Sequence, residues 1–268
     1  MQATPANPKG APATGTQDDA PVTHFLDLPF RPKPTRDAAR HIARQALDST
    51  EFWYVVTPNV DHMVRLEKQP QLRELYYEAG LILNDSRILE LLGQFDGLDL
   101  PASPGADVVE TLFDREVDTD EPIVVIGCTA SEISALKAKY GLSDVRWHDP
   151  PMGLRNKPEA VQAAAEFMAR NPSRFHFLCV GSPQQEMVAL AAKRLGTVTG
   201  AGLCCGASLD FLTGRATRAP EWMRDFRLEW LHRLTSEPQR MVKRYLLDGP
   251  KIFAIWWKDR KRRKASQS

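Results

Sequence analysis

The sequence predicts an α/β fold: a Rossmann-like, mostly parallel sheet with helices on both faces, followed by an all-helical C-terminal appendage. Short apolar, often β-branched segments alternate with helical patterns, as expected for successive strand–helix–strand units. After Gly206 the alternation stops and only helical patterns follow. With 268 residues, of which 43% are hydrophobic, the chain can bury a large core. It lacks an apolar run of about 18 residues, so a conventional spanning helix is excluded.

Three parts of the chain differ in composition. Residues 1–22 are rich in Ala, Pro, Thr and Gly and lack large hydrophobic side chains, so they predict a disordered tail. Residues 23–214 predict the α/β domain, and residues 215–268 predict a basic helical appendage. The N-terminus has no apolar signal segment and the four cysteines lack metal-site spacing. We therefore expect buried thiols in a protein of the reducing cytoplasm.

The elements follow from the periodicity of the apolar residues. Strands are predicted for the apolar runs 52–56, 81–84, 122–127, 145–148, 175–181 and 197–204. Helices are predicted where apolar residues recur three and four apart, at 35–47, 60–78, 88–92, 107–115, 131–140, 158–170 and 184–195. In the appendage, helices are predicted at 219–233, 236–247 and 250–258.

Polar residues follow several predicted strands, at the edge where parallel sheets bind ligands. Asp85 follows the run 81–84 and could act as a general base toward a hydroxyl, or it could cap the helix that starts next to it. Thr57 and Asn59 follow the strand at 52–56 and could bond a sugar or cap the helix after them. The residues alone leave both alternatives open in each case.

The segment after the strand at 175–181 has the pattern of an anion-binding helix start. Ser182 as N-cap, Pro183 at the first helical position and Gln185 at the third form a capping-box pattern. Exposed N–H groups and the helix dipole at such a start suit a pyrophosphate, and a purely structural cap is the alternative. The glycines at 200, 202 and 206 lack the spacing of the dinucleotide-binding fingerprint.

The net charge of +1 hides an asymmetry along the chain. Residues 215–264 contain 15 Lys and Arg against 6 Asp and Glu, a local charge of +9, so the rest of the chain has −8. Arg240 and Arg244 share a face of a predicted helix, with Arg233 in the preceding one. Four of the six tryptophans also lie in this stretch. Basic and aromatic residues together suit a membrane interface or a polyanion, and a solvated helical end is the alternative.

A set of motifs resembles the WecG/TagA/CpsF family of glycosyltransferases, in one order from about residue 25 to 247. They are Thr57-Pro58-Asn59, Asn84-Asp85, Pro104-Gly105-Ala106-Asp107, Val180-Gly181-Ser182-Pro183-Gln184-Gln185-Glu186, Gly206-Ala207-Ser208-Leu209-Asp210-Phe211-Leu212-Thr213-Gly214, Arg218-Ala219-Pro220, Leu228-Glu229-Trp230-Leu231-His232-Arg233-Leu234, Glu237-Pro238 and Arg244-Tyr245. Each is weak alone, but the ordered set is highly specific.

The resemblance implies an inverting, metal-independent transfer of a sugar from a UDP-sugar, with no cofactor. The sugar implied is N-acetylmannosamine, its uronic acid or a related hexuronic acid. The acceptor implied is a sugar on a polyprenyl diphosphate at the cytoplasmic face of the membrane. The product would be an intermediate of a cell-surface polysaccharide such as teichoic acid or an exopolysaccharide.

The same resemblance implies roles for individual residues. Asp85 matches the proposed general base, and Gln185 matches a glutamine near the donor. Thr57 and Asn59 match polar residues near the active site. The remaining residues that we assign to substrate binding are Arg87, Gly105, Asp107, Gly181, Glu186, Asp210, and the C-terminal Arg233, Arg240 and Arg244, of which Arg233 and Arg240 match arginines thought to close over the diphosphate.

The chain departs from the family pattern at three positions. Ser86 replaces a frequent glycine after the base, so that backbone cannot rely on glycine. Ala102 replaces an arginine, and we expect Arg87, which the usual pattern lacks, to supply the missing donor for the diphosphate. Lys243 stands where the family has another arginine, beside Arg244.

The appendage fits a lipid-linked acceptor. Residues 246–264 combine apolar, aromatic and basic side chains and end in five consecutive cations, each of which contributes roughly 1 kcal/mol near an anionic surface. We therefore expect a peripheral protein on the inner face of the cell membrane and no nucleic-acid partner. An apolar patch that docks the appendage could equally pair two subunits, so a homo-oligomer is an alternative to a monomer.

Two other functions compete with this prediction. A nucleotide-binding oxidoreductase of Rossmann type would share the fold, but the chain lacks the glycine fingerprint and its acidic partner. A non-enzymatic module that binds polyanions or membranes would need only the basic tail. The one Asp-x-Asp sequence in a loop, Asp118-Thr119-Asp120, precedes its strand rather than following it, which disfavours a metal site of the glycosyltransferase type.

Overall fold

The computed structural model describes residues 21–215 and 249–265. The parts of the prediction that lie outside the described residues are positions 1–20 of the predicted tail at 1–22, the predicted helices at 219–233 and 236–247, and Arg233, Arg240 and Arg244. The domain boundaries predicted at residues 22 and 214 stay predictions.

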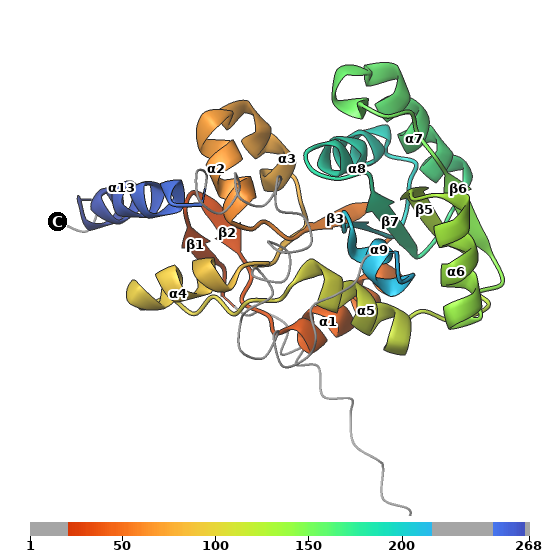
Figure 1. The fold of residues 1–268 in the computed structure, drawn as a ribbon, viewed down its shortest axis with the longest axis horizontal. Helices are drawn as coiled ribbons and strands as arrows, with labels where there is room; N and C mark the ends of the chain where they lie inside the picture. The colour runs from red at the N-terminus through yellow and green to blue at the C-terminus, as the bar shows by residue number, and fades with distance from the viewer. Residues whose placement is uncertain (1–20, 216–248, 266–268) are drawn as a thin grey trace, which may run out of the picture.

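A six-stranded sheet in which all strand pairs are parallel forms the centre of the molecule, in the order β4-β3-β8-β7-β5-β6 (Figure 1). The prediction of a Rossmann-like parallel sheet is therefore confirmed. The strands are β3 (Trp53–Val56), β4 (Leu81–Ile82), β5 (Ile123–Gly127), β6 (Val145–His148), β7 (Phe175–Cys179) and β8 (Ala201–Cys204).

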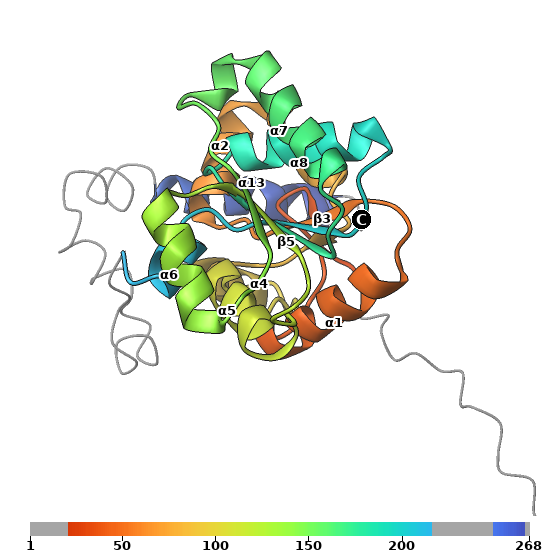
Figure 2. The ribbon, with the colours of Figure 1, turned by 90° about the vertical axis from the view of Figure 1, so that its right-hand side faces the viewer.

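Helices cover both faces of this sheet, as the sequence predicts. Successive residues of a strand point to opposite faces of the sheet, so they pack into two separate hydrophobic cores. Tyr54 and Val56 lie in one core, whereas Trp53 and Val55 lie in the other. The first face packs on α2 (Val60–Lys68), α3 (Glu74–Tyr77), α7 (Pro158–Arg170) and α8 (Gln184–Leu195), and the second on α1 (Thr35–Asp48), α5 (Gly105–Arg115), α6 (Ala130–Tyr140) and α9 (Ser208–Leu212). Figure 2 shows the two helical layers from the end of the sheet.

The predicted helix at 60–78 is wrong as a single element. α2 ends at Lys68, a 3-10 turn covers Pro70–Arg73, and α3 follows. The reason is Pro70, which has no N–H to donate and which disfavours the helical conformation at the residue before it. Gln69 accordingly has φ −136° and ψ 73°.

The sequence analysis missed a short hairpin at the start of the fold. β1 (Thr23–Phe25) pairs antiparallel with β2 (Leu28–Phe30). Its two-residue turn needs positive φ at both positions, and Leu26 and Asp27 adopt φ 51° and 63°. Leucine is a rare residue in such a turn, so local chemistry did not signal it. It is held there because its side chain is buried in the core.

A predicted strand at 81–84 is shorter than expected, because β4 ends at Ile82. Beyond it, Asn84 forms an isolated parallel bridge with Ala102. The Asn84 side chain also donates to the Leu100 carbonyl at 3.1 Å, and its carbonyl accepts from the Ser103 N–H at 2.6 Å. These bonds tie the segment before α5 to the edge of the sheet. They bring the start of α5 next to the residue that follows Asn84.

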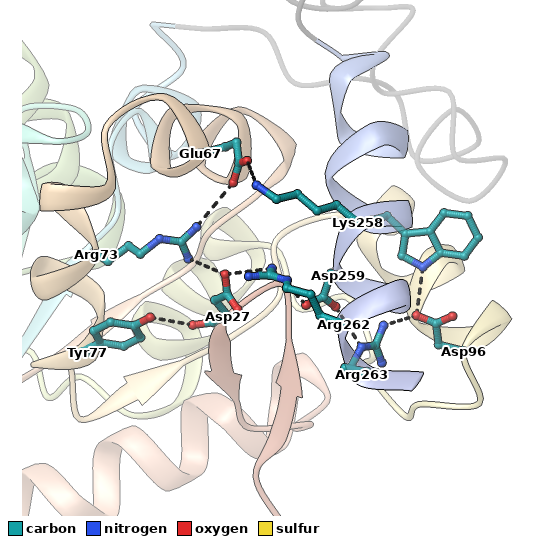
Figure 3. Close-up of polar contacts among 10 residues, drawn as sticks. Asp27, Glu67, Arg73, Tyr77, Asp96, Lys258, Asp259, Arg262 and Arg263 are labelled. Atoms are coloured by element: carbon teal, nitrogen blue, oxygen red, sulfur yellow. Dashed lines mark hydrogen bonds and ion pairs between the residues drawn. The ribbon is translucent and has the colours of Figure 1, made fainter. Parts of the chain in front are cut away.

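The C-terminal helix α13 (Lys251–Ala265) packs against the body through ion pairs as well as apolar contacts (Figure 3). Asp96, whose side chain is only 4% exposed, accepts from the Trp256 indole at 2.9 Å and pairs with Arg260 and Arg263. Arg262 pairs with Asp27 at 3.1 Å. Other contacts are Lys258 with Glu67 at 2.9 Å, Arg263 with Asp259 at 2.9 Å, and the burial of Ile252.

This docking changes how the basic run at 260–264 is to be understood. Arg260, Arg262 and Arg263 have carboxylate partners on the body or on the same helix, so much of their charge is balanced inside the protein. The helix is also longer than the predicted segment 250–258. Within the described ranges, no helix combines the length and the apolar character needed to cross a bilayer.

Candidate active site

Asp85 lies after the end of β4 and is held by donors from two other elements. One carboxylate oxygen accepts a hydrogen bond from the Gly105 backbone N–H, at 2.9 Å, and the other accepts from the Asn59 side-chain amide, also at 2.9 Å. Its own N–H donates to the Pro58 carbonyl at 3.1 Å. The carboxylate therefore sits where the segment after β3, the segment after β4 and the first turn of α5 meet.

The orientation of the Asn59 amide is determined by its position at the start of α2. As the N-cap residue, Asn59 accepts the Asp61 N–H on its side-chain oxygen at 3.1 Å, and its own N–H contacts the His62 ring nitrogen at 3.2 Å. Because that oxygen is used by the cap, the amide nitrogen must point the other way, toward Asp85. Asn59 therefore caps α2, which confirms one of its two predicted roles, and its amide also binds Asp85. Its bond to a sugar stays a prediction.

The alternative that Asp85 caps the next helix is wrong. α4 (Arg87–Phe95) has Ser86 as its N-cap, and the Ser86 hydroxyl accepts the Leu89 N–H at 3.4 Å. The Ser86 N–H in turn donates to the Asn84 side-chain oxygen at 2.9 Å. Ser86 therefore caps α4, a role that a glycine side chain cannot take, and the Asp85 carboxylate has other partners.

Thr57 and Gly105 are in contact at this site. A Cβ atom at Gly105 would lie 2.6 Å from the Thr57 hydroxyl oxygen, so only glycine lets the start of α5 approach this closely. Asp107 lies in the first turn of the same helix and is half-buried, with its N–H donating to the Pro104 carbonyl at 2.9 Å. The structure thus brings four of the predicted site residues together: Thr57, Asn59, Asp85 and Gly105.

Arg87 is linked to Ala102, the position where the resemblance leads us to expect an arginine. Its guanidinium pairs with the Glu90 carboxylate at 3.0 Å, and the other oxygen of Glu90 accepts the Ala102 N–H at 3.2 Å. One buried carboxylate therefore links Arg87 to the backbone of Ala102. The Arg87 side chain is half-exposed, and its contact with substrate stays a prediction.

A second group of predicted residues lies at the end of β7 and the start of α8. The capping box predicted for Ser182 and Gln185 is wrong, because α8 begins at Gln184 with Pro183 as N-cap and no side-chain cap. Instead the Gln185 side chain accepts the Gly206 N–H at 2.9 Å and donates to Glu186 at 3.1 Å. Gly181, at φ 75°, makes the turn between strand and helix.

Glu186 is fully buried, and this burial raises the pKa of its carboxyl. Ser182 and Gln185 bond to it, and Arg65 of α2 donates to the Ser182 hydroxyl at 2.8 Å. Since Asn59 is the N-cap of α2 and Arg65 lies within it, one helix joins this group to the Asp85 group.

A third group contains Asp210 of α9 and Glu132 of α6, whose side chains share a hydrogen bond. Glu132 is 3% exposed, accepts the Thr129 N–H at 2.7 Å and pairs with Arg215 at 2.8 Å. Although burial raises the pKa of Glu132, its bonds to Asp210, Thr129 and Arg215 lower it to about 2. Burial and the neighbouring Glu132 raise the pKa of Asp210 to about 6.

Glu132 was not among the predicted site residues. The signal was present as the pattern Thr129-x-x-Glu132, a capping box that the structure contains. Its pairing with Asp210 could not be predicted from the sequence, because the two residues are far apart along the chain and meet only when α9 packs beside α6.

The Asp210–Glu132 pair gives a testable pH dependence of stability. Because the pKa of Asp210 is higher in the folded protein than in the unfolded chain, stability falls as the pH rises from about 4 to about 6. Asp210→Asn keeps a donor toward Glu132 and removes this loss. We expect its melting temperature, relative to wild type, to rise between pH 4 and pH 7.

Thermal unfolding across this pH range measures that difference. Asp37→Asn, at an exposed carboxylate on α1, is the matched control. A difference between Asp210→Asn and wild type that stays constant with pH would show that Asp210 and Glu132 do not share a proton in the folded protein.

The sequence as a whole matches the model of the WecG/TagA/CpsF glycosyl transferase family over residues 23–266. This match covers nearly the whole chain. The chain belongs to this family. It is therefore a glycosyltransferase of cell-surface polysaccharide synthesis, and the predicted family is confirmed. The family also implies a nucleotide-sugar donor and a lipid-linked acceptor in general terms.

The contacts of Asp85 indicate which chemistry the site of this family member can perform. The Asp85 carboxylate is oriented by two donors that approach different oxygens. Such a carboxylate can accept a proton from an alcohol that is brought to the sheet edge. Gly181 and the hydrogen bond between Gln185 and Gly206 shape the neighbouring strand ends. Parallel sheets bind nucleotides at such strand ends.

Proposed function

We propose that the protein transfers a sugar from a UDP-sugar to a glycan on a polyprenyl diphosphate, with inversion at the anomeric carbon and Asp85 as general base. The observation that carries this proposal is the placement of the Asp85 carboxylate between the Asn59 amide and the Gly105 N–H. A carboxylate held by two donors at the edge of a parallel sheet is suited to accept a proton from an acceptor hydroxyl.

The reaction then proceeds as one displacement. The acceptor oxygen forms a bond to the anomeric carbon, its proton passes to Asp85, and the bond from that carbon to the UDP oxygen breaks. The negative charge that develops on the diphosphate needs cations nearby. We assign this stabilisation to Arg87 and to Arg233, Arg240 and Arg244, without a metal ion, so we expect transfer to persist in a metal chelator.

The remaining site residues have supporting roles in this proposal. Asn59 orients Asp85, and Thr57 lies beside the same helix start. Gly181, Gln185 and Glu186 shape the donor side of the site, with Asp107 and Asp210 as further contacts to substrate. The transferred sugar is N-acetylmannosamine, its uronic acid or a hexuronic acid, and the enzyme works at the inner face of the membrane through residues 246–264.

A thermal-shift screen followed by a transfer assay tests this function. UDP and UDP-sugars are expected to raise the melting temperature, since a ligand at a hundred times its Kd stabilises by about 2.7 kcal/mol. NAD is the matched control for the competing oxidoreductase, and DNA for the polyanion-binding module. Stabilisation by NAD or by DNA but not by UDP would contradict the proposal, as would the absence of transfer to a synthetic polyprenyl-diphosphate sugar.

A further inference from the structure

Three of the four cysteines lie on one face of the sheet, at the ends of its central strands. Cys179 is the last residue of β7, and Cys205 follows the last residue of β8. Both pack on the second core, as does Cys128, whereas Cys204 lies in the first core. The predicted burial of the thiols is confirmed for Cys204 and Cys205 and is wrong for Cys128 and Cys179, which are partly exposed.

The sulfur atoms of Cys179 and Cys205 are in contact, 3.4 Å apart. Leu178 and Cys204, the residues before them, are register partners, and the Cys205 N–H donates to the Leu178 carbonyl at 3.1 Å. The pairing of β7 with β8 therefore continues to the two cysteines. Neighbouring strands lie about 4.8 Å apart, within the roughly 4.4–6.8 Å that a disulfide allows between its Cα atoms. The backbone thus already has the separation that a disulfide needs.

We propose that Cys179 and Cys205 are a modification site, at which a peroxide oxidises the two thiols to a disulfide that a dithiol reduces again. The Cys179 sulfur attacks a peroxide oxygen, the O–O bond breaks, and a sulfenic acid and water form. The Cys205 sulfur then attacks the Cys179 sulfur, the S–O bond breaks, and a second water leaves. In total the two thiols lose two hydrogen atoms, and hydrogen peroxide is reduced to two molecules of water.

Two features of Cys179 determine how this oxidation proceeds. Cys179 is partly exposed, whereas Cys205 is buried, so we assign the attack on peroxide to the Cys179 sulfur. The neighbouring thiols of Cys128 and Cys205, together with its partial burial, raise the pKa of the Cys179 thiol. Because the thiolate is the form that attacks, we expect the oxidation to be slow at neutral pH and faster at alkaline pH.

The disulfide changes the strand ends that border the donor side of the proposed active site. Cys205 directly precedes Gly206, whose N–H donates to the Gln185 side chain at 2.9 Å. When the bond forms, the two sulfur atoms must approach from 3.4 Å to about 2.05 Å. This movement shifts the backbone next to Gly206, so we expect oxidation to weaken the binding of UDP. That effect rests on the proposed function, whereas the formation of the disulfide does not.

Peptide mapping after oxidation tests the proposal. The full-length protein is treated with hydrogen peroxide at alkaline pH, the remaining thiols are alkylated in denaturant, and the peptides are identified by mass spectrometry. We expect the peptide that contains Cys179 to be linked to the peptide that contains Cys204 and Cys205, and dithiothreitol to release it. Two variants identify the second sulfur atom. Cys204→Ala, at the neighbouring thiol on the other face of the sheet, is the matched control and should keep the linkage, whereas Cys205→Ala should lose it.

The binding of UDP measures the effect of the disulfide. In wild type and in Cys204→Ala, peroxide is expected to weaken UDP binding at least about tenfold, since small shifts at a site are costly, and dithiothreitol is expected to restore it. In Cys205→Ala, peroxide should leave UDP binding unchanged. Melting temperatures before oxidation show whether each variant is folded, and the map of wild type needs no substitution.

The outcomes separate this proposal from the proposed function. Wild type in which Cys179 stays alkylated, or gains oxygen without a linkage, would overturn the proposal. So would a linkage of Cys179 to Cys128, or one that Cys204→Ala loses and Cys205→Ala keeps. A linkage that leaves UDP binding unchanged would overturn the effect on the donor side. If the linkage forms but the reduced protein binds no UDP, the proposed function fails and the modification site stands.

Discussion

Asp85→Asn is expected to lower the rate of sugar transfer by a factor of at least about 100, the range in which a general base contributes. An asparagine can still accept the Gly105 N–H on one atom, but it cannot take the proton of the acceptor hydroxyl. Its amide would also face the amide of Asn59, which is held in place by the cap of α2. Initial rates with a lipid-linked or short-chain acceptor measure the effect.

The control separates the loss of the base from the loss of the fold. Asp37→Asn removes an exposed carboxylate from α1 and should leave transfer and stability unchanged. Asp85→Asn should keep the stabilisation by UDP that wild type shows, because the carboxylate is assigned to the acceptor. Turnover within a few-fold of wild type would remove Asp85 from the role of base.

Asn59→Ala offers a finer comparison within the same site. It leaves the carboxylate in place but removes the donor that orients it and the cap of α2. A loss of transfer smaller than that of Asp85→Asn is expected, together with about 1 kcal/mol of lost stability from the cap. Equal losses in both variants would indicate that orientation and proton transfer cannot be separated here.

Gly105→Ala has the second largest expected effect. Its new Cβ would lie 2.6 Å from the Thr57 hydroxyl oxygen and 3.4 Å from two Thr57 carbons, so the start of α5 must shift. We expect a loss of about 1–3 kcal/mol in the free energy of unfolding, as for other overpacked sites. Transfer should fall at least about tenfold, since the shift draws the Gly105 N–H away from Asp85, and small misplacements at a reacting centre are costly.

A double variant identifies the cause of that effect. Thr57→Ala removes the hydroxyl that the new Cβ would meet, so Gly105→Ala should cost much less stability in the Thr57→Ala background than in wild type. Chemical denaturation of the four proteins measures this coupling. The same cost in both backgrounds would show that the close contact with Thr57 is not what requires glycine at this position.

The positive charge of the C-terminal part of the sequence is not the same as an exposed positive surface in the folded protein. The excess of 9 positive charges in residues 215–264 suggests a free cationic surface. In the structure, several of these cations form ion pairs with Asp27, Asp96 and Asp259, and the pairs with Asp27 and Asp96 help to dock α13 on the body. Much of this charge is therefore balanced within the protein.

Local patterns were sufficient for most of the fold. The predicted strand at 145–148 and the predicted helices at 158–170 and 184–195 match the structure residue for residue. In the two helices the apolar periodicity agrees with the observed burial. The helix at 60–78 was too long, since the effect of Pro70 was not included. The hairpin at residues 23–30 was missed because Leu26 is held in its turn by burial, not by local preference.

The sequence by itself determined the family, the parallel α/β architecture and the candidate carboxylate Asp85 after the predicted strand at 81–84. Periodicity and ordered motifs are local properties of the sequence, so they can be recognised without the structure. Only the tertiary structure decided which groups surround Asp85: Ser86 takes the helix cap, and Asn59 and Gly105 hold the carboxylate. It also decided that Asp210 meets Glu132 and that Arg87 is anchored through Glu90. These contacts join residues from different elements, and hydrogen bonds of that kind depend on packing rather than on sequence spacing.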